Sequence, residues 1–151
     1  MKSKIIQILI IGVIGILSGI LLIQCGKQNL KSESVQETKQ EKTTQQSGYY
    51  EMSIKQLKTE LNKKNFLFVN VHIPYAGELP GTDLFIPFDK LTENLDKLPE
   101  QKDARIVLYC RSGHMSAIAA KTLAQSGYTN VYDVPGGMKA WVKEGYELIH
   151  K

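Results

Sequence analysis

Residues 104–116 read Ala-Arg-Ile-Val-Leu-Tyr-Cys-Arg-Ser-Gly-His-Met-Ser, and this stretch decides the fold. Its apolar beginning, which ends at Tyr109, predicts a strand that is buried on both faces. The polar, glycine-containing segment that follows predicts a tight loop. The Ala-rich residues through Gln125 then predict a helix, with Gly127 as its terminator. A buried strand, a loop and a helix in this order are typical of an α/β domain.

The flanking sequence repeats this alternation in both directions. Ser53 and Gln56 have the spacing of a capping box, and apolar residues at helical spacing follow, which predicts a helix that ends near residue 62. The other predicted elements are strands at 66–71, 84–86 and 130–134, a helix at 91–98 stopped by Pro99, and a last helix that starts at about residue 138 and ends near Gly145. We therefore expect an α/β fold with a mostly parallel sheet flanked by helices.

Length, cysteine count and charge exclude several classes of protein. Residues 49–151 have the usual size of one compact domain, which excludes a multidomain enzyme and a polytopic membrane protein. Cys25 and Cys110 are the two cysteines, too few for a disulfide scaffold or a cysteine-based zinc site. The 19 basic and 15 acidic residues give a net charge of +4, which becomes +2 without Lys2 and Lys4. Because the other lysines form no basic block, we expect no nucleic-acid partner.

Residues 1–24 are expected to be a signal peptide or a membrane anchor. Lys2 and Lys4 precede an uncharged apolar run at 5–23, as in a secretory signal. At about 1.5 Å per helical residue this run reaches roughly 28 Å, so it also has the length to span a bilayer uncleaved. The two lysines favour an inside amino terminus. We therefore expect the domain at the cell membrane, on the extracytoplasmic face.

Cys25 is a candidate lipidation site. Residues 22–26 read Leu-Ile-Gln-Cys-Gly and resemble the lipobox of bacterial lipoproteins, with Gln24 where a small residue is usual. The alternative is that Cys25 is a thiol at the end of a membrane helix. Residues 25–48 are otherwise rich in Lys, Glu and Gln, and we expect them to be a flexible polar linker with a reach of roughly 25 Å.

Cys110 is the candidate functional residue of the domain. It follows a buried strand and precedes a helix, and ligand sites of open α/β sheets gather at such carboxyl ends of strands. The N–H groups of a tight loop and the helix dipole both favour a thiolate, so we expect the pKa of Cys110 to lie below its ordinary value. The alternative is an inert core cysteine, which is the commoner fate of a lone cysteine.

Three segments, together with the loop that begins at Cys110, resemble the rhodanese-like domain family, over essentially the whole of residues 53–146. Asn70-Val71-His72 occupies the place of the family's Asp-x-Arg after the first buried strand. The loop 110–116 resembles the active-site loop of that family. The other two segments are Gly77-Glu78-Leu79-Pro80-Gly81-Thr82, similar to the family's Gly-His-Ile-Pro-Gly-Ala, and Val131-Tyr132-Asp133-Val134-Pro135-Gly136-Gly137-Met138-Lys139-Ala140-Trp141, similar to its closing strand, Gly-Gly pair and helix. Three such segments in the right order indicate a single rhodanese-like domain of the membrane-tethered or lipoprotein type.

The resemblance implies a sulfurtransferase with a catalytic cysteine at Cys110. Its thiolate would take sulfane sulfur from a donor such as thiosulfate, forming a persulfide, and pass it to a thiol or another thiophilic acceptor. The implied substrate-binding residues are those that follow in the loop: Arg111, Ser112, Gly113, His114, Met115 and Ser116. No cofactor and no metal are implied. Trp141 is expected to pack in the core.

The chain departs from the family pattern at three positions. Asn70 and His72 stand in the place of an Asp-x-Arg motif, and Met115 stands where many members have Arg. Fewer fixed cations near Cys110 should weaken the binding of a doubly charged donor. His72 and His114 each have the alternative of an imidazole with only a local hydrogen bond.

Other classes of protein compete with the sulfurtransferase. A cysteine phosphatase is disfavoured because its loop needs an Arg six positions after the nucleophile, where this chain has Ser116. A zinc hydrolase is disfavoured because His72, His114 and His150 lack metal-ligand spacing. The alternative that stays open is a non-catalytic, surface-tethered module that binds a partner or relays redox state.

Overall fold

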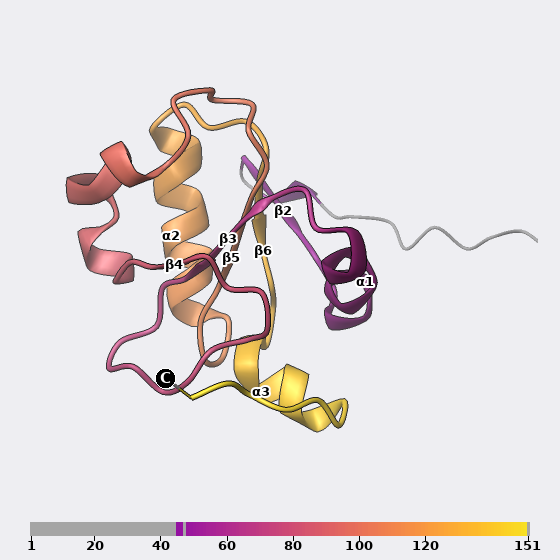
Figure 1. The fold of residues 1–151 in the computed structure, drawn as a ribbon. Helices are drawn as coiled ribbons and strands as arrows, with labels where there is room; N and C mark the ends of the chain where they lie inside the picture. Colours follow the sequence, from indigo (N-terminus) through magenta and orange to yellow (C-terminus); the bar gives the residue numbers. More distant parts are fainter. Residues whose placement is uncertain (1–44, 47, 151) are drawn as a thin grey trace, which may run out of the picture. The chain divides into compact units, whose positions relative to one another are not determined.

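The computed structural model describes residues 45, 46 and 48–150, and their strands form one sheet in the order β1-β2-β6-β5-β3-β4 (Figure 1). The strands are β1 (Gln45–Gln46), β2 (Tyr49–Glu51), β3 (Leu67–Asn70), β4 (Leu84–Phe85), β5 (Ile106–Tyr109) and β6 (Val131–Asp133). β1 pairs with β2 antiparallel, and the other pairs are parallel. The predicted α/β fold with a mostly parallel sheet is confirmed.

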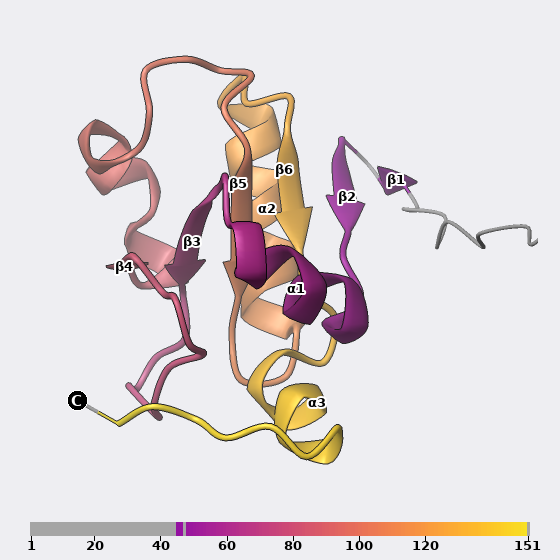
Figure 2. The ribbon, with the colours of Figure 1, turned by 45° about the vertical axis from the view of Figure 1, so that its right-hand side comes forward.

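Helices cover both faces of the sheet. They are α1 (Ile54–Glu60) with a 3-10 turn (Leu61–Lys63), the 3-10 helices η2 (Phe88–Lys90) and η3 (Thr92–Lys97), α2 (His114–Gln125) and α3 (Gly137–Lys143). Figures 1 and 2 show α2 with η2 and η3 on one side, and α1 with α3 on the other. The predicted cap of α1 is present, because the Gln56 N–H donates to Ser53 Oγ at 3.2 Å.

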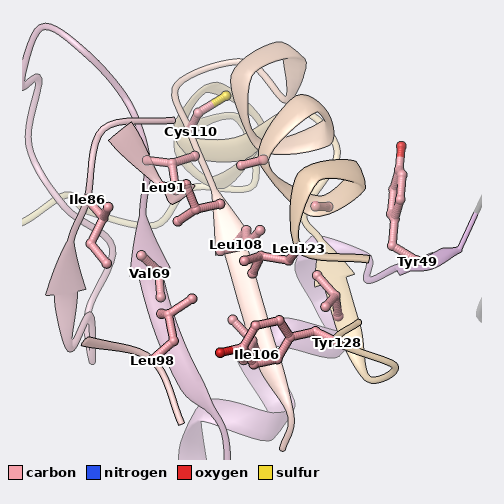
Figure 3. Close-up of a cluster of buried hydrophobic side chains, with 14 residues drawn as sticks. Tyr49, Val69, Ile86, Leu91, Leu98, Ile106, Leu108, Cys110, Leu123 and Tyr128 are labelled. Atoms are coloured by element: carbon pink, nitrogen blue, oxygen red, sulfur yellow. The ribbon is translucent and has the colours of Figure 1, made fainter. Parts of the chain in front are cut away.

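Two hydrophobic clusters lie on the two faces of the sheet, and β5 contributes to both. Ile106, Leu108 and Cys110 belong to the cluster under α2 (Figure 3), whereas Val107 and Tyr109 belong to the cluster under α1 and α3. This is the period of two that a strand imposes on its side chains. Cys110, the residue after β5, therefore directs its side chain toward α2.

The first strands of the sheet were not predicted. β2 pairs with β6 in parallel, and its first residue, Tyr49, and the residue that follows it, Met52, are buried. Gln45 and Gln46, which were expected in the linker, pair with Tyr50 and Tyr49. A three-residue strand is too short to show a period, and its strand conformation depends on pairing with β6, far away in the sequence.

The helix predicted at 91–98 was wrong in type. The segment is the 3-10 helix η3, interrupted at Asn94, whose φ of −125° and ψ of 27° are not helical. The Asn94 side chain donates to the Lys90 carbonyl at 2.7 Å. A side chain that bonds a nearby carbonyl competes with the helical backbone, and this explains the break.

The predicted leader at 1–24, most of the linker and Cys25 lie outside the described residues. Within residues 45, 46 and 48–150, no helix has the length and apolar character needed to cross a bilayer.

Candidate active site

The candidate site is the loop between β5 and α2, at the carboxyl edge of the sheet. Cys110 follows the last residue of β5, and α2 begins four residues later at His114. The Cys110 side chain is 1% exposed and points from the strand end toward α2 (Figure 3). The predicted order of strand, loop and helix is confirmed, and it places the sulfur where ligands of parallel sheets bind.

Two donors converge on the Cys110 sulfur. The Gly113 N–H donates to Sγ at 3.1 Å, and the Ser116 hydroxyl lies 3.5 Å from Sγ. The same hydroxyl is 3.1 Å from the Gly113 carbonyl oxygen. Donors aimed at a sulfur stabilise a negative charge on it, whether as thiolate or as persulfide.

The loop keeps its shape through contacts with α3. The Met138 N–H donates to the Cys110 carbonyl and the Lys139 N–H to the Arg111 carbonyl, both at 3.0 Å. Gly137, with a φ of +49°, makes this approach possible, because a Cβ at that position would lie 1.9 Å from the Cys110 oxygen. The first two carbonyls of the loop are therefore turned toward α3.

Asn70 orders the turn that follows β3. It is fully buried, its Nδ2 donates to the Gly77 carbonyl at 3.1 Å, and its Oδ1 accepts the His72 N–H at 3.0 Å. Asn70 thus connects two segments of the resemblance, the Asn-x-His position and the segment that begins at Gly77.

His72 lies close enough to Arg111 to feel its charge. The pKa of His72 is lowered by burial and, to a smaller extent, by Arg111. The imidazole is therefore neutral at pH 7 and adds no fixed cation beside the loop. Its Nδ1 is buried and has no hydrogen-bond partner among the described residues.

The six loop residues predicted to bind substrate divide into two groups. Gly113 and Ser116 contact the sulfur, as described above, and Ser116 is fully buried. Arg111, Ser112 and His114 are exposed at the surface. Met115 is only partly buried and packs against the hydrophobic cluster under α2.

A cavity of about 250 Å³ lies on the α3 side of the loop. Two of its lining residues, Arg111 and Lys139, are cations, and the others are apolar: Ala76, Met138, Val142 and Leu148. Met138 and Lys139 also bond the carbonyls of Cys110 and Arg111, so the cavity adjoins the backbone of the loop, although Cys110 is not among its lining residues. It offers cationic and apolar contacts to a small molecule or a side chain.

Asp133 is a residue of the site to which the sequence pattern assigned no role. It is 3% exposed, and its Oδ1 has no hydrogen-bond partner among the described residues. Burial raises the pKa of Asp133 to about 6, while hydrogen bonds from the Ser116 hydroxyl and the Val134 N–H act in the opposite direction. The available signal was its spacing of two from Val131, which puts an acid on a core-facing position of a predicted buried strand.

Comparisons with known proteins agree with this geometry. A sulfurtransferase from Allochromatium vinosum is 30% identical over 89 residues, which are 57% of this chain and 80% of that protein. A tRNA uridine(34) hydroxylase from Erwinia tasmaniensis is 31% identical over 93 residues, which are 58% of this chain. The matched region spans only 27% of that larger protein.

A solved structure and a family profile cover the same region. The crystal structure of a rhodanese-like domain protein from Staphylococcus aureus superimposes with a TM-score of 0.55 at 30% identity, and the match covers 67% of this chain and 98% of that one. The profile described as Rhodanese-like domain matches residues 53–144, which include β3 to β6 and the whole loop around Cys110. The chain therefore belongs to the rhodanese-like domain family.

Proposed function

We propose that this protein is a sulfurtransferase that carries sulfane sulfur as a persulfide on Cys110. The observation that supports it most is the sulfur itself: Sγ lies at the carboxyl end of β5 with the Gly113 N–H at 3.1 Å and the Ser116 hydroxyl at 3.5 Å. An inert core cysteine needs no such donors. The relative from Allochromatium vinosum, which is matched over 80% of its length, is named a sulfurtransferase, and this supports the same proposal.

The proposed reaction has two steps. In the first, the Cys110 thiolate attacks the outer sulfur of a donor such as thiosulfate. A bond forms between Sγ and that sulfur, the bond between the two donor sulfurs breaks, and sulfite leaves with the electron pair. In the second, a thiolate or cyanide attacks the outer sulfur of the persulfide, and the Cys110 thiolate leaves. The second step returns the negative charge to Sγ, which the Gly113 N–H and the Ser116 hydroxyl stabilise.

The charges around the loop favour an anionic donor. Arg111 and Lys139 are exposed cations beside the cavity, whereas His72 is neutral at pH 7. Because exposed cations are screened by salt, we expect the Michaelis constant for thiosulfate to rise with ionic strength. Two solvent-exposed cations also fit weak rather than tight binding of a doubly charged donor.

Thiocyanate formation from thiosulfate and cyanide tests the proposal. The wild-type protein should turn over with ping-pong kinetics, and Cys110→Ser should give no thiocyanate above the blank. Circular dichroism of the variant should match the wild type, so that a lost fold is not mistaken for lost chemistry. A wild-type protein that does not turn over would instead favour the non-catalytic module, which the low exposure of Cys110 supports.

We also propose that the domain is tethered to the outer face of the cell membrane through a lipid on Cys25. The support is in the sequence: Leu22 and Gly26 flank Cys25 as in a lipobox, and a polar linker follows. Acyl chains contribute about 0.8 kcal/mol per buried methylene, enough in combination for stable anchoring. Labelling cells with an alkyne fatty acid should mark the wild type and not Cys25→Ala. A membrane-bound, unlabelled wild type of full precursor mass would indicate an uncleaved anchor.

A further inference from the structure

Asp133 lies on the same face of the sheet as the reactive sulfur. In the parallel pair of β5 and β6, Asp133 is the register partner of Leu108. Leu108 and Cys110 both belong to the cluster under α2, and so does Val131, two residues before Asp133. The alternation of side chains along the two strands therefore directs the Asp133 carboxyl toward the first turn of α2.

The surroundings of Asp133 are poor in compensating charge. Two of the groups that act on its carboxyl are hydrogen-bond donors, the Ser116 hydroxyl on α2 and the Val134 N–H, and a third, Glu51 on β2, is another acid. Tyr49 on β2 is also close, because Asp133 raises the pKa of Tyr49, although burial is the larger cause. Oδ1 of Asp133 is buried and has no hydrogen-bond partner within the described part of the chain. A carboxyl in such a place exchanges its proton readily near neutral pH.

Ser116 connects this carboxyl to the sulfur. Its hydroxyl has one proton, and it lies 3.5 Å from Cys110 Sγ and 3.1 Å from the Gly113 carbonyl. An ionised Asp133 can only accept, so it competes with Sγ and with the Gly113 carbonyl for that proton. A protonated Asp133 can donate to the hydroxyl oxygen and leave the Ser116 proton to the sulfur and the Gly113 carbonyl.

We propose that Asp133 is a positioning residue whose proton determines, through Ser116, whether a second hydrogen bond reaches Cys110 Sγ. With Asp133 protonated, Sγ accepts from both Gly113 and Ser116. With Asp133 ionised, Sγ keeps the Gly113 N–H and loses the hydroxyl. The carboxyl does not contact the substrate and acts only through the serine.

The consequence for sulfur transfer rests on the proposed function. When an acceptor takes the outer sulfur of the persulfide, the Cys110 thiolate is the leaving group, and a hydrogen bond to Sγ stabilises it. Protonation of Asp133 should therefore accelerate discharge of the persulfide. The burial of this carboxyl raises its pKa to about 6, so both forms are populated in mildly acidic surroundings.

The coupling is tested by alkylation of Cys110, which needs no sulfurtransferase activity. The full chain in detergent is treated with iodoacetamide from about pH 5 to about 8, and modified Cys110 is quantified by peptide mass. For an isolated thiol the logarithm of the rate rises by one per pH unit below the thiol pKa. In the wild type we expect a shallower rise around pH 6, because the hydroxyl leaves the sulfur as Asp133 ionises. The shortfall should be roughly tenfold, as for one hydrogen bond to a charged group.

Three variants separate the explanations. Asp133→Asn and Ser116→Ala should each restore the uniform rise, and the exposed control Asp103→Asn should behave as the wild type. A uniform rise in the wild type would overturn the proposal. A shallow rise that survives in Ser116→Ala would overturn it too, since Asp133 would then act through space. Persulfide formation, measured separately, reports on the proposed function, so the two failures are distinguishable.

Discussion

The two hydrogen bonds to Cys110 Sγ come from donors of different kinds. The Gly113 N–H belongs to a backbone with a φ of +95°, and a Cβ there would lie 2.8 Å from the Gly136 nitrogen, so this donor is fixed by the fold. The Ser116 hydroxyl rotates and has a second acceptor within reach, the Gly113 carbonyl at 3.1 Å. The Gly113 N–H therefore always points at the sulfur, whereas a neighbouring charge can turn the Ser116 hydroxyl toward another acceptor.

Asp133 should make the free energy of unfolding depend on pH. Its pKa is about 6 in the folded protein against an ordinary value of 3.8, so the folded state holds the proton more tightly than the unfolded chain. The stabilisation is therefore complete below about pH 4 and is lost as the pH rises through about 6. The loss should be about 3 kcal/mol relative to Asp133→Asn, measured by denaturant unfolding across that range. If the unfolding free energies of the wild type and Asp133→Asn changed with pH in the same way, the raised pKa of the Asp133 carboxyl would be contradicted.

At the scale of elements, the loop depends on α3, which is distant in sequence. The N-terminal amides of α3 bind the Cys110 and Arg111 carbonyls, and two glycines with positive φ, Gly136 and Gly137, allow the helix to begin there. β5 also holds the segment that begins at Gly77, since the Tyr109 hydroxyl accepts the Leu79 N–H at 3.0 Å. Hydrogen bonds thus join the loop to the closing segment at α3, and join β5, which precedes the loop, to the segment that begins at Gly77.

Gly137→Ala should destabilise the protein and impair the site together. A Cβ at Gly137 would lie 1.9 Å from the Cys110 oxygen, so α3 must move away and release the loop. We expect a loss of several kcal/mol of unfolding free energy in urea, together with lost thiocyanate formation.

Gly145→Ala is the matched control for this variant. Gly145 also has a positive φ, +85°, but among the described residues nothing lies within 4 Å of the place that its Cβ would take. Only backbone strain remains there, which costs about 1 kcal/mol and should leave activity intact. Equal effects of the two substitutions would show that strain, and not the contact with Cys110, determines the outcome.

Features that depend on residues close together in the chain were mostly predictable from the sequence, and features that depend on distant residues were not. The site around Cys110 was predictable because its donors, Gly113 and Ser116, are near neighbours in the chain. Trp141 was correctly placed in the core, where it is 1% exposed. The interruption of η3 at Asn94 was missed because apolar spacing does not report a side chain that bonds a nearby backbone carbonyl, here that of Lys90.

The role of Asp133 and the strand β2 needed the structure for a different reason. Both depend on pairing between segments that are far apart in the chain: Glu51 with Asp133, and Asp133 with Leu108. Spacing along one segment indicates which residues share a face, but not which strand lies beside it. The sequence alone therefore places Asp133 in the segment 131–141 that resembles the family, but does not place it near Ser116 or Cys110.

At the scale of the whole molecule, β2 completes the domain at its N-terminal side. The family match starts at residue 53, whereas Tyr49 is 7% exposed and Met52 is fully buried. β2 also covers the edge of β6, where Asp133 lies. The folding unit therefore begins before the segment that the family defines.

A truncated chain beginning at Gly48 should unfold cooperatively and stay monodisperse, because it keeps β2. A chain beginning at Ser53 loses Tyr49, Met52 and the pairing with β6, and should be less stable by several kcal/mol. Denaturant unfolding and size-exclusion chromatography of the two chains make the comparison. Equal stability would show that β2 is dispensable and that the domain begins at α1.

The central claim is that Cys110 carries the sulfur, and intact-mass measurement tests it most directly. The wild-type protein is incubated with thiosulfate, the excess thiosulfate is removed, and the intact mass is measured. The protein is then treated with cyanide, and the mass is measured again. The account predicts a gain of one sulfur atom that maps to Cys110, is lost with cyanide and is absent in Cys110→Ser. A wild-type mass that thiosulfate leaves unchanged, or an added sulfur that persists in Cys110→Ser, would contradict it.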